Sequence, residues 1–111
     1  MCGQPVVKLL QPESTDYVVL KPKNSAFFET TLALLLTYLG TKRLILMGLT
    51  TDACVQFTAQ DAYLRDFELS VPSNCVASAS MEQTQMSLAY MQRVLQADVT
   101  PTTELDLQRF L

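Results

Sequence analysis

Residues 44–55 read Leu44-Ile45-Leu46-Met47-Gly48-Leu49-Thr50-Thr51-Asp52-Ala53-Cys54-Val55, and this stretch decides the fold. An apolar run leads into Gly48, and a helix-like pattern follows from Ala53 to about Arg65. We therefore expect Cys54 at a junction of strand, turn and helix, in the first turn of the helix.

The position of Cys54 gives its thiol a distinctive environment. The first turn of a helix exposes backbone N–H groups and the positive end of the helix dipole. Such a site favours the thiolate over the thiol and raises its nucleophilicity at neutral pH. The same N–H groups could bind an oxyanion. The alternative is that Cys54 is simply a small buried hydrophobic residue.

Outward from this stretch, predicted strands and helices alternate along the chain. Apolar runs predict strands at residues 16–20, 43–47, 67–71 and 97–100, and helical spacing predicts helices at 29–39, 52–66, 81–96 and 104–111. Gly40 is expected to end the first of these helices as a C′ glycine. Ser80 and Gln83 fit a capping box at the start of the third.

The order of these elements predicts an α/β fold with a parallel sheet and right-handed crossovers. The run at 43–47 is apolar without alternation, as is typical of strands covered on both faces. Active sites in such sheets lie beyond the carboxyl ends of the strands. Lys21 follows the first predicted strand and Cys54 follows the second, so both are expected at that edge.

The composition excludes several classes of function. The chain has 111 residues, enough for one domain, and a net charge of −3 without a basic cluster. Nothing in it favours a nucleic acid or a membrane as partner. Its longest apolar stretch near a helix, 32–36, is too short to span a bilayer. The N-terminus lacks the charge-then-apolar layout of a signal peptide, so a cytoplasmic location is expected.

The cysteines and the absence of histidine restrict the chemistry further. Cys2, Cys54 and Cys75 are an odd number at wide spacing, and the chain has no histidine. We therefore expect no disulfide framework, no metal site and no cofactor. Catalysis by Ser-His-Asp or Cys-His is excluded within this chain, and a nucleophile needs another base.

These residues resemble the isochorismatase-like cysteine hydrolases, a family that includes nicotinamidases, N-carbamoylsarcosine amidases and ureidoacrylate amidohydrolases. Three segments carry the resemblance, which extends from about residue 16 to residue 103. They are Asp16-Tyr17-Val18-Val19-Leu20-Lys21, Ser25-Ala26-Phe27 and Gly48-x-x-Thr51-Asp52-x-Cys54-Val55-x-x-Thr58-Ala59-x-Asp61-Ala62.

The resemblance implies a three-layer α/β/α, Rossmann-like sheet and an Asp–Lys–Cys triad. Cys54 matches the nucleophile, which would form a thioester with a small amide or ureido substrate, and Lys21 matches the family lysine. The backbone N–H groups of Thr50 and Cys54 match the oxyanion hole, and Leu49-Thr50 matches a cis peptide. Phe27 matches an aromatic residue that lines the substrate pocket in relatives, although core packing explains it equally well.

The sequence departs from the family at the third triad member. No residue here matches the catalytic aspartate, which in the family ends the first strand, so the general base stays unassigned. The chain resembles about the second half of the family domain, and we expect 1–111 to be a single, partial domain that lacks its first two strands. An open gap there would separate Lys21 from Cys54 by about 14 Å, since neighbouring strands are about 4.8 Å apart.

Several functions therefore remain open. The main expectation is a cysteine hydrolase that cleaves a small amide or ureido C–N bond. Since no residue matches the triad aspartate, this expectation does not extend to activity of the chain by itself. The alternatives are a non-catalytic fragment or assembly module, and a hydrolase of vinyl ethers like the isochorismatase branch. A homo-oligomer or a complementing chain could cover the exposed strand edges.

Overall fold

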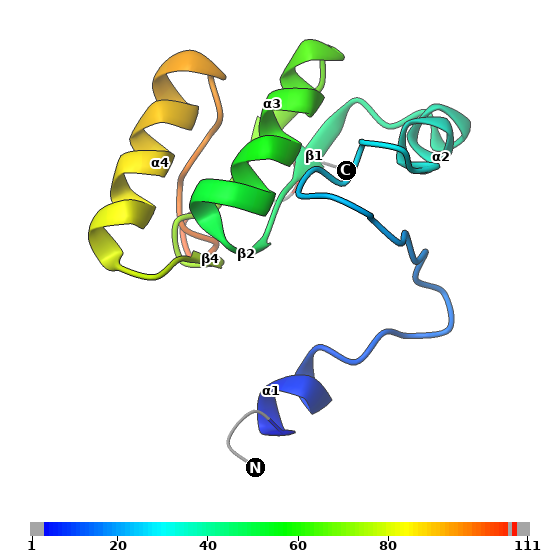
Figure 1. The fold of residues 1–111 in the computed structure, drawn as a ribbon, viewed down its shortest axis with the longest axis horizontal. Helices are drawn as coiled ribbons and strands as arrows, with labels where there is room; N and C mark the ends of the chain where they lie inside the picture. The colour runs from blue at the N-terminus through cyan, green and yellow to red at the C-terminus, as the bar shows by residue number, and fades with distance from the viewer. Residues whose placement is uncertain (1–3, 107, 109–111) are drawn as a thin grey trace.

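The computed structural model describes residues 4–106 and 108 (Figure 1). Its elements follow one another in the order α1 (Gln4–Leu9), α2 (Leu32–Leu39), β1 (Arg43–Ile45), β2 (Gly48–Leu49), the π-helical turn η1 (Thr51–Val55), α3 (Gln56–Leu64), β3 (Glu68–Ser70), β4 (Val76–Ala77) and α4 (Met81–Val94). The core of the chain thus alternates strand and helix, which confirms the predicted α/β class.

All of the described strand pairs are parallel. β1 pairs with β3 in the register Arg43 to Glu68, and β2 pairs with β4 in the register Gly48 to Val76. A single parallel bridge joins Ser70 to Asp98, and this bridge is all that forms of the strand predicted at 97–100. Three backbone segments therefore lie side by side and parallel, with residues 68–77 between residues 43–49 and Asp98.

Local signals set the ends of two helices as predicted. Gly40 follows α2 with φ 67° and ψ 25°, and its N–H bonds to the carbonyl oxygens of Leu36 and Thr37. This left-handed geometry favours glycine because it lacks a Cβ. At the start of α4, the hydroxyl of Ser80 accepts a hydrogen bond from the N–H of Gln83 at 3.1 Å.

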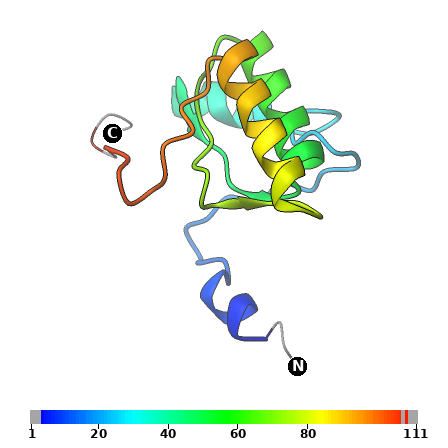
Figure 2. The same ribbon diagram turned by 90° about the vertical axis from the view of Figure 1, so that its left-hand side faces the viewer.

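α3 and α4 lie side by side against the strands, and the two views agree on this packing (Figures 1 and 2). Apolar side chains from these helices and from the strands are buried between them. The core includes Ala59, Ala62, Leu69, Val71, Met91 and Leu95. α2 contributes one buried side chain, Leu36, to the same cluster. This packing fixes the start of α3, which directly follows the turn that carries Cys54.

The prediction of a strand at 16–20 is wrong. Residues 17–21 form neither strand nor helix, and Tyr17, Val18 and Leu20 are exposed. A strand needs a neighbour that pairs with its backbone N–H and C=O groups. None of the described strands pairs with this segment, so its apolar pattern has no sheet to join.

The two ends of the chain differ from expectation as well. α1 has no counterpart among the predicted helices, and it projects away from the remainder of the chain (Figures 1 and 2). Of the helix predicted at 104–111, residue 104 lies in a turn and residues 105 and 106 are irregular. Most of the rest of that helix, and Cys2, lie outside the described residues. Within the described part of the chain, no helix has the length and apolar character needed to cross a membrane.

Candidate active site

Cys54 lies in the turn that connects the sheet to α3. β2 ends at Leu49, η1 runs from Thr51 to Val55, and α3 continues from Gln56. The predicted helix therefore begins as a π-turn, a rare geometry that often occurs at functional sites. The carbonyl oxygen of Thr50 accepts hydrogen bonds from the N–H groups of Ala53 and Val55, at 3.2 and 3.1 Å.

The side chain of Lys21 lies against Cys54. Its Nζ donates to Cys54 Sγ at 3.4 Å and to the carbonyl oxygen of Lys23 at 3.2 Å. The structure therefore does not have the separation of about 14 Å that an open gap in the sheet would give. Lys21 lies on an irregular segment, and this segment brings its side chain to the turn that carries Cys54.

Asn24 is a further polar group beside the sulfur. Its side-chain Nδ2 lies 3.9 Å from Cys54 Sγ, on the same side as the Lys21 loop. Sulfur is a weak acceptor, and contacts with an ammonium and an amide donor suit its anionic form better than its neutral form. The Cys54 sulfur therefore has two nitrogen donors beside it, from Lys21 and Asn24.

A small pocket surrounds these groups. Its volume is about 300 Å³, and Cys54 is half-buried at its wall. The lining includes Lys21, Ala26, Met47, Leu49, Cys54 and Thr58. Lys21, Cys54 and Thr58 therefore face a space whose other lining residues are apolar or glycine, as is common in sites for small molecules.

The loop that carries Lys21 is held on α3 by hydrogen bonds that sequence reasoning did not identify. Ser25 Oγ donates to a carboxylate oxygen of Asp61, and the N–H of Ala26 donates to Thr58 Oγ1 at 3.0 Å. Ser25 Oγ also accepts from the N–H of Phe27 at 3.1 Å. The signal was present in the sequence, because these residues belong to the quoted segments around Ser25 and Thr58. Its meaning is structural: the two segments bind each other.

Phe27 is part of the core. Its side chain is 5% exposed, its ring lies 6.1 Å from that of Phe67, and the guanidinium of Arg65 lies 4.9 Å from its ring centre. Phe27 is not among the residues that line the Cys54 pocket. Its predicted place in the substrate pocket is thus not what the structure describes, because burial against Phe67 turns the ring inward.

The structure also describes the cis peptide bond and the two backbone N–H groups of the predicted site. The peptide bond between Leu49 and Thr50 is cis. Thr50 is exposed and directly precedes η1, so its N–H and that of Cys54 lie on the same turn. Their role as an oxyanion hole stays a prediction.

The residues present do not fit a metal site. The chain has no histidine, the commonest metal ligand among side chains. Among the described residues, no three side chains of Cys, Asp or Glu gather closely enough to hold an ion.

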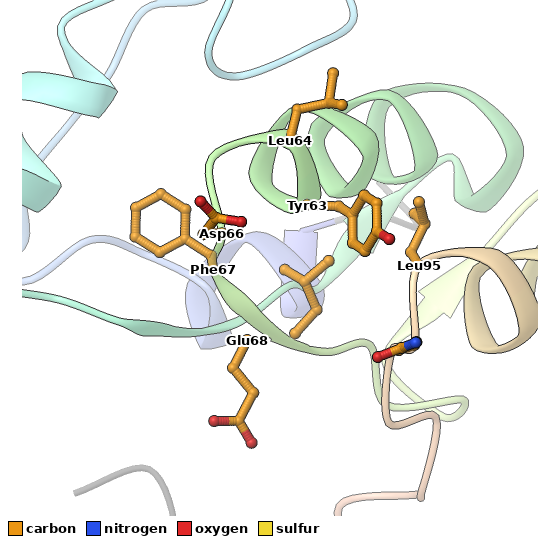
Figure 3. Close-up of a pocket in the computed structure, with 8 residues that line it drawn as sticks. Tyr63, Leu64, Asp66, Phe67, Glu68 and Leu95 are labelled. Atoms are coloured by element: carbon orange, nitrogen blue, oxygen red, sulfur yellow. The ribbon is translucent and has the colours of Figure 1, made fainter.

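A larger cleft lies at the other end of α3 (Figure 3). It measures about 470 Å³ and is lined by residues from the end of α3, from β3 and from the end of α4, among them Tyr63, Asp66, Glu68 and Leu95. Glu68 forms an ion pair with Arg43 at 2.9 Å. None of the predicted site residues lines this cleft, so the candidate active site is the smaller pocket.

Comparison with known proteins identifies the family. The model of the isochorismatase domain matches residues 2–104 of the chain. The chain belongs to the isochorismatase family. An uncharacterized isochorismatase family protein of Bacillus subtilis, YaaI, is 39% identical over 100 residues, which cover 90% of this chain and 55% of YaaI. The ureidoacrylate amidohydrolase RutB of Acinetobacter baylyi is 34% identical over 71% of this chain and 33% of its own length.

Solved structures of the family agree with the fold. An N-carbamoylsarcosine amidase from Thermoplasma acidophilum superposes with a TM-score of 0.77 at 34% identity, over 86% of this chain and 53% of the amidase. The nicotinamidase of Staphylococcus aureus gives the same TM-score at 28% identity, over 86% of this chain and 60% of its own. The family thus includes hydrolases of amides, and this chain spans between about a third and three fifths of the length of these four relatives.

Proposed function

We propose that this chain carries the nucleophilic half of an amide hydrolase site, with Cys54 as the nucleophile. The observation that carries the proposal is the contact of 3.4 Å between Lys21 Nζ and Cys54 Sγ. An ammonium at this distance stabilises a thiolate, and the N–H groups of the turn add to that effect. The names of the relatives, which include amidases and an amidohydrolase, supply the class of substrate.

The proposed reaction has two steps. In the first, Cys54 Sγ attacks the carbonyl carbon, the C–N bond breaks, and the leaving nitrogen takes up a proton, which gives a thioester. In the second, water attacks the thioester carbon, the C–S bond breaks, and the acid and the free thiol are released. The N–H groups of Thr50 and Cys54 would hold the oxygen that becomes negative in both steps.

Lys21 acts in this scheme as an electrostatic partner. Its side chain is exposed to solvent, and its nitrogen faces the sulfur. No carboxylate of the described residues is hydrogen-bonded to Lys21 or Cys54 in the structure, so the proposal assigns no general base within this chain. The protons of both steps would pass through water or through a group that a complementing chain supplies.

The experiment is an assay of purified protein against small amides and ureido compounds, including nicotinamide, ureidoacrylate and N-carbamoylsarcosine. Intact-protein mass spectrometry would follow the acyl adduct on the cysteine. We expect hydrolysis or an adduct that Cys54→Ala abolishes and that Cys75→Ala leaves intact, since Cys75 lies outside the pocket. If the chain forms no adduct and releases no product with any member of the panel, the proposal fails.

A second candidate is a non-catalytic assembly module, and the exposed apolar side chains favour it. Val18, Leu20, Met47 and Leu49 are each more than 60% exposed near the β1–β2 edge and the adjoining loop. Unpaired strand edges with apolar side chains bind other chains readily. Size-exclusion chromatography with light scattering tests this candidate, and a stable monomer across a wide concentration range would contradict it.

A further inference from the structure

A chain of buried hydroxyl groups connects α4 to the turn that carries Cys54. Thr51 is fully buried, and Thr84 and Ser87 are 4% and 5% exposed. Burying a hydroxyl costs free energy unless it has a hydrogen-bond partner, so such groups are kept where their partners are fixed. Each of the three has a partner, and every partner belongs to the turn, to the start of α3, to α4 or to the loop before α4.

The contacts run through Thr84 and Ser87. Thr84 Oγ1 lies 3.2 Å from Thr51 Oγ1 and 2.6 Å from Ser78 Oγ. Ser87 Oγ donates to Gln56 Oε1 and lies 3.4 Å from the carbonyl oxygen of Thr51. A hydroxyl has a single proton, so Ser87 serves one of these two acceptors at a time. Both acceptors flank Cys54, three residues before it and two residues after it.

The turn between these two points is not self-supporting. A π-turn of five residues makes too few internal hydrogen bonds to define its own position, so contacts with other elements decide it. α4 runs alongside α3 (Figure 1), and its inner face supplies those contacts. The Lys21 loop is held independently, by the bonds of Ser25 and Ala26 to α3.

We propose that Thr84 and Ser87 are positioning residues, which hold the turn so that the Cys54 sulfur faces the Lys21 ammonium. This inference rests on the proposed role of Cys54 as a nucleophile paired with Lys21. Neither hydroxyl is bonded to the sulfur: Thr84 acts through the side chain of Thr51, and Ser87 acts through the Thr51 carbonyl and the side chain of Gln56. Lys21 is therefore located by α3, and Cys54 is located by α4 together with the start of α3.

The test is a double-mutant cycle read out on thiol reactivity, which requires no substrate. The rate of alkylation of Cys54 by iodoacetamide at pH 7 is measured by peptide mass spectrometry for the wild type, Lys21→Met, Thr84→Val and the double variant. We expect Lys21→Met to slow alkylation about fivefold in the wild type, as a surface charge pair allows. In the Thr84→Val background, Lys21→Met should slow the alkylation of Cys54 less than about twofold, because the sulfur no longer faces the ammonium.

Three controls separate positioning from stability. Leu88→Ala lowers the melting temperature by removing core volume from the same helix, without touching the hydroxyl chain, and the fivefold effect of Lys21→Met should persist there. Thr84→Ser keeps the hydroxyl and should restore the fivefold effect. If Thr84→Val does not fold, Ser87→Ala takes its place in the cycle with the same expectation.

Each outcome decides one question. A fivefold effect of Lys21→Met in every background would overturn the positioning role of Thr84 and leave the proposed pairing of Lys21 and Cys54 intact. No effect of Lys21→Met in any background would overturn the pairing, and this inference with it. A loss of coupling in Leu88→Ala equal to that in Thr84→Val would show that general destabilisation, and not the hydroxyl chain, moves the sulfur.

Discussion

Lys21 Nζ lies 3.4 Å from Cys54 Sγ, although 33 residues separate the two along the chain. The contact is made between an irregular loop and a π-turn, and neither segment has a regular structure that would locate it alone. Hydrogen bonds to α3 hold the loop, and buried hydroxyl groups of α4 hold the turn. The candidate active site therefore depends on two helices that lie behind it.

Lys21→Met should slow the alkylation of Cys54 about fivefold at pH 7, which corresponds to the ~1 kcal/mol of an exposed charge pair. The reason is that the neutral side chain no longer stabilises the thiolate. Added salt should reduce the difference between the variant and the wild type, because Lys21 is exposed to solvent. Lys23→Met is the matched control, since the Lys23 side chain lies outside the Cys54 pocket. Equal rates for both variants and the wild type would contradict the prediction.

Ser25→Ala should lower the free energy of unfolding by about 2 kcal/mol, measured by urea denaturation. The substitution removes the hydroxyl that donates to Asp61 and accepts from the N–H of Phe27, and both partners are then left without it. Ser14→Ala is the control, because Ser14 is exposed in a turn far from the core. A loss below about 0.5 kcal/mol, equal to that of the control, would show that the loop is held by other contacts.

Gly40→Ala should destabilise the chain by about 1 kcal/mol, because alanine is strained at a φ of 67°. An added Cβ meets no atom within 4 Å, so the cost comes from the backbone and not from a clash. Gly40→Asn should cost less, since asparagine adopts the left-handed region more readily. Thermal unfolding of the two variants measures the order, and an equal loss in both would argue against backbone strain as the cause.

Met91→Ala should cost between about 2 and 5 kcal/mol, because the side chain is fully buried in the core between α4 and the strands. Met86→Ala on the same helix should change the stability by less than about 0.5 kcal/mol, since Met86 is 67% exposed. Chemical denaturation of the pair provides the comparison. Similar losses for both would mean that Met86 is covered in solution, as a self-associating chain would cover it.

Local sequence signals predicted much of the fold because they act within a few residues. The helical period and Gly40 predicted the end of α2, and the capping box at Ser80 predicted the start of α4. The apolar run before Gly48 predicted the extended segment that contains β1 and leads into β2. The same reasoning failed at residues 16–20, because an apolar run predicts a strand only where a neighbouring strand is available to pair with it.

The sequence by itself determined that the chain is an α/β protein of the isochorismatase family and that Cys54 lies on the turn between sheet and helix. The fold class and the turn follow from periodicity and end caps, which act within a few residues, and the family follows from the resemblance of the quoted segments. Only the tertiary structure decided that Lys21 faces Cys54 and that Phe27 belongs to the core. Such contacts join residues tens of positions apart, and packing, not local preference, sets which of them meet.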